Sequence, residues 1–82
     1  MTHKAKLKWH CRRGMRELDL LLDEFLENRY QTLSTIGRHS FERLLDCSNK
    51  DLVDWIMGGD LPQDEQLAEI VSRIRDRRAP SE

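Results

Sequence analysis

Apolar residues along this chain recur at intervals of three and four, the spacing that places side chains on one face of an α-helix. The pattern is strongest in the first third of the chain, where charged residues fill the positions between the apolar ones. It predicts a helix with one buried stripe: Leu18, Leu21, Leu22, Phe25, Leu26 and Tyr30. No run of alternating β-branched residues occurs anywhere in the sequence, so the chain is predicted to be all-α.

Two shorter helices are expected on either side of this stripe. Residues 5–13 form a first helix with little apolar content, and Gly14 provides its stop or bend. Ser34 caps a third helix that runs to about Cys47, although Gly37 weakens its first turn. The inward face of that third helix is predicted to carry Ile36, Phe41, Leu44 and Leu45.

Two more helices are predicted from residues that cap or terminate them. The run from Ser48 to Asp51 resembles a capping box with Asp in the last place, and Gly58-Gly59 ends the short helix that follows. Pro62 is expected in the first turn of a last helix with a stripe of Leu67, Ile70, Val71 and Ile74. The predicted architecture is a compact five-helix bundle of short antiparallel helices, a single domain over residues 1–82 with a frayed tail at 79–82.

Charge is distributed unevenly, although the 82-residue chain has a net charge of only −1. The first sixteen residues hold no acid and carry a series of cations: Lys4, Lys6, Lys8, Arg12, Arg13 and Arg16. Acids follow directly: Glu17, Asp19, Asp23, Glu24 and Glu27. Such asymmetry suits oriented docking to a protein partner, and a merely solvated surface is the alternative interpretation.

Metal and nucleophile chemistry find little support. His10 and Cys11 are adjacent while His3, His39 and Cys47 are scattered, and a metal site needs ligands at ordered spacing. A nucleophilic cysteine needs a base beside it, and His10 points away from Cys11 on a helix. Cys11 and Cys47 are therefore interpreted as small, half-buried apolar residues. Two cysteines make no disulfide framework, and the chain starts without an apolar leader, so a cytoplasmic location with reduced thiols is expected.

Nucleic-acid binding is a weaker candidate. The basic start with Trp9 and the arginines at 73–78 would meet phosphates, but an isoelectric point near 6.3 argues against this function. The helix after Ser48 is also too apolar for a recognition helix. Trp55 is interpreted mainly as a core anchor.

Gly14 lies among charged residues where two helical patterns meet, and function is most expected there. Glycine in a helix interior is unfavourable by roughly 0.5–1 kcal/mol relative to alanine, so something other than packing is expected to keep it. Trp9 and Met15, close to this glycine, are candidate contacts with a partner. The stretch is therefore interpreted as a docking site.

The run Arg13-Gly14-Met15-Arg16-Glu17 matches the Arg-Gly-x-x-Glu signature of the FAD assembly factors of succinate dehydrogenase. The longer string from Cys11 to Asp19 resembles the bacterial members almost letter for letter. The resemblance extends over nearly the whole chain, including Phe41–Cys47 and Asp51–Met57.

This resemblance implies a small five-helix protein that binds the flavoprotein subunit of succinate dehydrogenase and, in bacteria, that of fumarate reductase. Such a protein would promote covalent attachment of FAD to a histidine of that subunit. The attachment is thought to be self-catalysed by the flavoprotein, so the resemblance implies a monomeric chaperone and not an enzyme, with no stably bound cofactor. The implied partner-binding residues are Arg13, Gly14 and Glu17, with Met15, Arg16, Asp19 and Trp9 beside them.

The residue types suggest a role for each member of the signature. Gly14 would let a partner backbone approach without a Cβ, and Arg13 would offer a charge or a forked set of donors. Glu17 would fix Arg13 or meet a basic group of the partner. Two other classes stay open: an antitoxin-like module of the cytoplasm, as some bacterial relatives are described, and a nucleic-acid-binding regulator.

Overall fold

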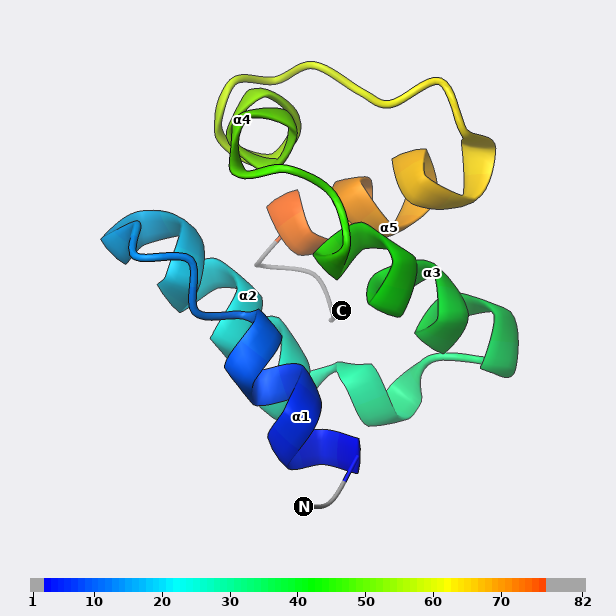
Figure 1. Cartoon of the computed structure of the whole chain (residues 1–82). Helices are drawn as coiled ribbons and strands as arrows, with labels where there is room; N and C mark the ends of the chain where they lie inside the picture. The colour runs from blue at the N-terminus through cyan, green and yellow to red at the C-terminus, as the bar shows by residue number, and fades with distance from the viewer. Residues whose placement is uncertain (1–2, 77–82) are drawn as a thin grey trace.

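The chain folds into helices joined by short connections, as the computed structural model shows for residues 3–76 (Figure 1). Within that range there are five α-helices, two short helical segments of other types and no strand. The elements are α1 (His3–His10), α2 (Arg16–Asn28), η1 (Tyr30–Thr32), α3 (Thr35–Leu45), α4 (Asn49–Leu52), η2 (Val53–Met57) and α5 (Glu65–Arg75). The predicted all-α class and its five helices are confirmed. The expected fraying of residues 79–82 lies outside the described residues, and the single-domain assignment stays a prediction.

The helices form two packed groups that share one core. In Figure 1, α1 and α2 lie side by side and run in opposite directions, as predicted for the bundle. α3 and α5 also pack against each other, but they run in the same direction because α4, η2 and a long loop separate them in the chain. η2 contacts both α2 and α5 and so links the two groups.

The core is built on the predicted stripe of α2. Leu18, Leu22 and Leu26 are fully buried there, and Phe25 stacks on Phe41 of α3 with ring centroids 5.3 Å apart. The inward residues of α5 complete the core as expected from their spacing: Leu67, Ile70, Val71 and Ile74. Leu21, at the border of the stripe, is only partly buried.

The expected inward position of Ile36 is wrong, since 63% of this residue is exposed. Ser34 caps α3 by accepting a hydrogen bond from the Gly37 amide at 3.1 Å, as predicted, but this first turn projects beyond the core. Ser40, one turn later, is buried instead. Its hydroxyl donates to the Ile36 carbonyl oxygen at 2.9 Å, which removes the cost of burying it.

The expected start of the last helix at Pro62 is also wrong. α5 begins at Glu65, because the Asp64 carboxylate caps it by accepting from the amides of Gln66 and Leu67 at 2.9 and 3.1 Å. A carboxylate cap satisfies two free amides, whereas proline only supplies a suitable φ. Similarly, α1 ends at His10 and not at Arg13.

The helix after Ser48 starts where the sequence predicts but changes type. The Ser48 hydroxyl accepts from the Asp51 amide at 3.1 Å, which caps α4. From Val53 the chain widens into a π-helical turn, and the Gly58 amide donates to the Val53 carbonyl oxygen at 2.8 Å. Gly59 follows with a φ of +90°, so the predicted end of this helix at the glycine pair is confirmed.

Candidate functional site

Residues 11–15 form the tight connection between α1 and α2, and Gly14 sets its direction. Its φ is +81°, a left-handed conformation that side-chain-bearing residues rarely adopt. A Cβ placed on Gly14 would meet no atom within 4 Å, so backbone conformation and not crowding requires glycine here. The bend predicted at this position is confirmed, and the space over the glycine is open.

The carboxylate of Asp19 holds this turn from the first part of α2. One oxygen accepts a hydrogen bond from the Arg13 amide at 2.8 Å, and the other accepts from the Gly14 amide at 3.1 Å. The Asp19 amide in turn donates to the Met15 carbonyl oxygen at 2.7 Å. Asp19 therefore shapes the turn, and both of its oxygens are occupied within the chain.

The side chain of Arg13 joins the turn to the end of α3. Its guanidinium donates to the carbonyl oxygens of Leu45 and Cys47, the latter at 3.1 Å, and to the Asn49 side-chain oxygen at 3.3 Å. Its Nε donates to the His10 carbonyl oxygen at 3.0 Å, at the end of α1. The carbonyls at a helix end lack partners within the helix and carry partial negative charge, so an arginine stabilises them.

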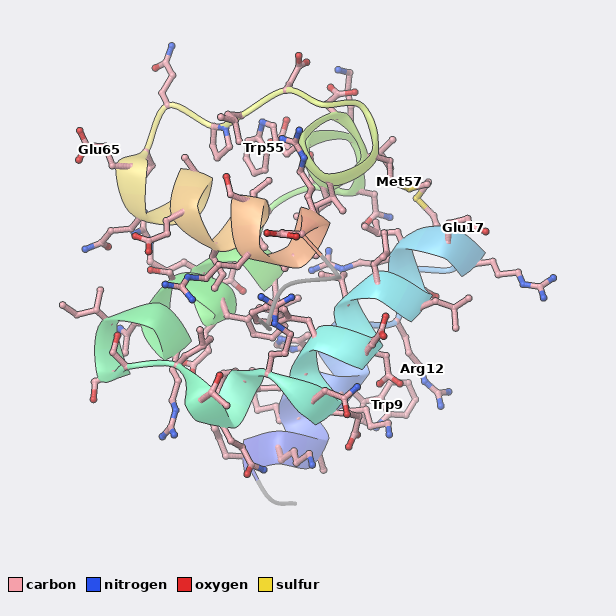
Figure 2. All side chains as sticks on the ribbon, turned by 180° about the vertical axis from the view of Figure 1, so that it is seen from behind. Trp9, Arg12, Glu17, Trp55, Met57 and Glu65 are labelled. Carbon is pink, nitrogen blue, oxygen red and sulfur yellow. The ribbon has the colours of Figure 1, made fainter. Side chains whose placement is uncertain are left out.

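Glu17 faces away from this network. Of the two roles expected for Glu17, the link to Arg13 is absent, and across residues 3–76 the Glu17 side chain makes no hydrogen bond or ion pair. Figure 2 shows Glu17 at an edge of the molecule, with Met57 of η2 on the same side. Gly14, Met15 and Arg16 are exposed as well. The signature thus divides into Arg13, which faces inward, and four consecutive outward-facing residues.

Exposed apolar side chains border this turn. Trp9 of α1 is 62% exposed, and the Arg12 guanidinium lies over its ring at 5.7 Å from the centroid. Both lie at the same side of the molecule in Figure 2. Leu20 of α2 is 58% exposed, and the sequence pattern did not single it out because helical spacing identifies only the buried face. Its position off that stripe was the available indication.

Trp55, by contrast, is half-buried and packs against the core, as predicted.

Much of the charge asymmetry is neutralised between α1 and α2. Glu27 pairs with Lys4 at 3.2 Å and with Lys8 at 2.9 Å, and Lys8 also lies 3.8 Å from Asp23. The hydrogen bond that Lys8 donates to Glu27 raises the pKa of Lys8 and lowers the pKa of Glu27. For these residues the solvated-surface interpretation is the better one. Arg16, however, has no ion pair within the described range.

The two thiols sit in different surroundings. Cys11 is fully buried, more than the half-buried position expected, and burial raises its pKa to about 12. Cys47 is partly exposed, its Sγ donates to the Arg43 carbonyl oxygen at 3.7 Å, and burial again raises its pKa. Thiols with raised pKa values are poor nucleophiles at neutral pH.

Residues 3–76 contain neither a cluster of metal ligands nor a membrane-spanning helix. No group of three His, Cys, Asp or Glu side chains there is arranged to hold a metal ion. No helix in the same range has the length and apolar character needed to cross a membrane.

Together these features define a small all-α protein with a rigidly held, outward-facing turn suited to contact with another protein. A family model described as "Flavinator of succinate dehydrogenase" (Sdh5) matches residues 5–78. The FAD assembly factor SdhE of Yersinia pseudotuberculosis is 44% identical over 77 residues, covering 94% of this chain and 88% of that protein. The factor of the same name from Shewanella oneidensis is 45% identical over 76 residues, covering 93% of each chain. The chain belongs to the family of succinate dehydrogenase flavinators, which confirms the resemblance and the implied role in the flavinylation of succinate dehydrogenase.

Proposed function

We propose that this chain binds the flavoprotein subunit of succinate dehydrogenase through the turn around Gly14 and so promotes covalent attachment of FAD to that subunit. The observation that carries the proposal is the division within the turn. Arg13 and Asp19 hold it from inside, and Gly14, Met15, Arg16 and Glu17 are left facing outward. A contact surface held in this way loses little conformational entropy on binding.

The proposed role is that of a chaperone and not of an enzyme. Covalent attachment requires a carbon of the flavin and the acceptor histidine to be held in reacting geometry, and such positioning lowers a barrier by several kcal/mol, as an order of magnitude. A rigid helical protein seated on the flavoprotein would hold it in that pose. The buried Cys11 thiol, with its raised pKa, supports positioning over covalent participation. FAD would stay with the partner and not bind stably to this chain.

Three further features belong to the same proposal. The fumarate reductase flavoprotein would be a second client, as the family resemblance implies. The chain would act as a monomer. It would work in the cytoplasm, for which the two free thiols are suited. No nucleic acid and no insertion into a membrane would be involved.

The test is co-expression of the flavoprotein subunit with variants of this chain, with covalent flavin measured by in-gel fluorescence. Glu17→Ala is expected to lower the covalent flavin strongly. Glu65→Ala is the matched control, since Glu65 is also exposed in the first turn of a helix and lies at the opposite edge of the molecule in Figure 2. Equal flavin with both variants would remove Glu17 from the proposed surface.

Gly14 needs two substitutions, because its positive φ makes most replacements strained. Gly14→Asn tolerates the left-handed conformation and adds a side chain over the turn, whereas Gly14→Arg adds both bulk and strain. Gly14→Asn is expected to keep the unfolding temperature near that of the wild type and still reduce covalent flavin. Full flavinylation by a folded Gly14→Asn protein would contradict a close approach at this residue.

A pull-down from the source cell separates the proposal from the antitoxin-like alternative. Recovery of a toxin with no flavoprotein subunit would overturn the proposal. Nucleic-acid binding predicts an affinity that falls steeply with salt, so the lack of any gel shift at low salt would exclude it.

A further inference from the structure

A shallow hollow of about 370 Å³ lies between α1 and α2, next to the Gly14 turn but outside the Arg-Gly-x-x-Glu signature for most of its lining. Leu20 lines it with more than half of its surface exposed. The remaining lining is almost entirely charged: Lys8, Arg12, Arg16, Asp19 and Asp23. An exposed apolar side chain with polar groups around it resembles, on a small scale, the apolar centre and polar rim of a protein interface.

The charges around this hollow are not balanced along its length. At the end away from the turn, Lys8 is matched by Asp23 and Glu27. At the end next to the turn, the Asp19 carboxylate already accepts two main-chain amides. No acid within residues 3–76 pairs with either Arg12 or Arg16.

The lining therefore carries three cations and two anions, which leaves an excess of one positive charge beside an apolar side chain. Within residues 3–76 the Arg12 side chain interacts only with the Trp9 ring, so no acceptor there takes a hydrogen bond from its guanidinium. Glu17 is the neighbour of Arg16 in sequence, but adjacent helical residues point in different directions and the two do not pair. A guanidinium of this kind binds a carboxylate through paired hydrogen bonds.

We propose that this hollow receives a segment of the flavoprotein subunit that places an apolar side chain against Leu20 and a carboxylate at Arg12 and Arg16. The inference rests on the proposed function, since it names the chemistry of the partner at a second part of the same surface. It also extends the contact from the turn along the outer face of α2, toward Asp23. The outward residues of the turn and the hollow then form one continuous docking surface.

The test is the affinity of the full-length chain for the purified flavoprotein subunit, measured by titration calorimetry at low and at physiological ionic strength. Arg16→Glu is expected to raise the Kd by about ten-fold or more at low salt, and to weaken the salt dependence of binding. Arg75→Glu is the matched control, because Arg75 is exposed on α5 and makes the same charge change elsewhere. Equal effects of the two variants would overturn the proposal.

The proposed apolar contact at Leu20 is tested with a substitution there and a matched control substitution at Ile36. Leu20 and Ile36 are aliphatic residues of similar exposure, 58% and 63%, on different helices. Leu20→Ser is expected to raise the Kd by about ten-fold, and Ile36→Ser to leave it within about two-fold. Circular dichroism melts of both variants establish that they remain folded. A folded Leu20→Ser protein with wild-type affinity would contradict the proposed contact.

Two outcomes distinguish this inference from others. If the wild-type chain neither binds the flavoprotein nor raises covalent flavin, the proposed function itself fails. If the wild type does both, Glu17→Ala lowers covalent flavin and Leu20→Ser matches its control, only the assignment of the hollow fails. A second copy of this chain is the other possible occupant of the hollow, and sedimentation of the chain alone tests it. A concentration-dependent dimer that Arg16→Glu dissociates would overturn the proposal.

Discussion

Arg13 reaches across the fold to Cys47, 34 positions away in the sequence, and donates a hydrogen bond to its carbonyl oxygen at 3.1 Å. The same guanidinium binds the Leu45 carbonyl oxygen and the Asn49 side chain. The turn that carries the outward-facing residues is thereby fixed to the end of α3. The arginine of the signature contributes to the surface by holding it in place.

Replacing Arg13 with lysine is expected to destabilise the fold although the charge is kept. Lysine has no forked set of donors, so at least one of the carbonyl oxygens at the end of α3 loses its partner. The expected loss in free energy of unfolding is about 1–2 kcal/mol, measured by urea denaturation. Arg12→Lys is the control, since Arg12 is exposed and contacts the Trp9 ring. Equal midpoints for the two variants would show that Arg13 does not hold the turn.

Asp19→Ala is expected to loosen the turn itself. The amides of Arg13 and Gly14 lose their acceptor, which costs about 1–3 kcal/mol where the groups are partly shielded from water. Hydrogen exchange should show faster exchange at these two amides and unchanged protection in α5. Protection that stays at the wild-type level at both amides would mean that another group orders the turn.

The pair of Tyr30 and Glu42 is expected to make stability depend on acidic pH. The Tyr30 hydroxyl donates to Glu42 at 2.8 Å, and this bond, followed by that of His3, lowers the pKa of the carboxyl below its usual 4.5. A lowered pKa in the folded state stabilises the fold above the ordinary pKa of glutamate. That contribution is lost as the pH falls through the folded-state value.

Tyr30→Phe tests this relationship, because the ring can keep its place beside Phe41, 5.6 Å away between centroids. The variant is expected to be less stable than the wild type by about 1 kcal/mol at pH 7. The difference should shrink as the pH falls below 4.5, measured by urea denaturation across the range. If wild type and variant differed in stability by the same amount at every pH, the contribution of Tyr30 would not depend on the ionisation of Glu42.

The two thiols are expected to react at very different rates with a disulfide reagent such as Ellman's reagent. Cys11 is buried with a pKa of about 12, so it should react only when the chain unfolds. Cys47 is partly exposed and should account for all of the reaction in the folded state. Cys47→Ser should therefore abolish the native-state reaction. Rapid labelling of that variant without denaturant would contradict the burial of Cys11.

The buried stripe of α2, the caps at Ser34 and Ser48 and the bend at Gly14 could be predicted from sequence, because each depends on residues close together in the chain. The inward position of Ile36 and the helix start at Pro62 were predicted wrongly, because helical spacing and proline preference are local signals. Ile36 lies beyond the edge of the core, and the cap at Asp64 sets the start of α5. These errors left the predicted number and order of helices unchanged.

The candidate site shows the same limit. Its location at the Gly14 turn followed from sequence, but the inward direction of Arg13 did not. That direction depends on residues 45–49 lying beside the turn, which no local pattern reveals. The exposed Leu20 was missed because periodicity identifies the buried face and leaves the outer face undescribed. Which of the outward residues contact a partner stays a prediction.

The anchoring of the turn by a distant segment also orders events during synthesis. A ribosome releases residues 9–20 well before residues 45–49, and until the later segment folds back, Arg13 has no carbonyl oxygens of Leu45 and Cys47 to bind. The turn with its outward-facing residues is therefore completed late, although it lies near the start of the chain. A nascent or truncated polypeptide that ends before Leu45 would carry the whole signature but none of these carbonyl oxygens for Arg13.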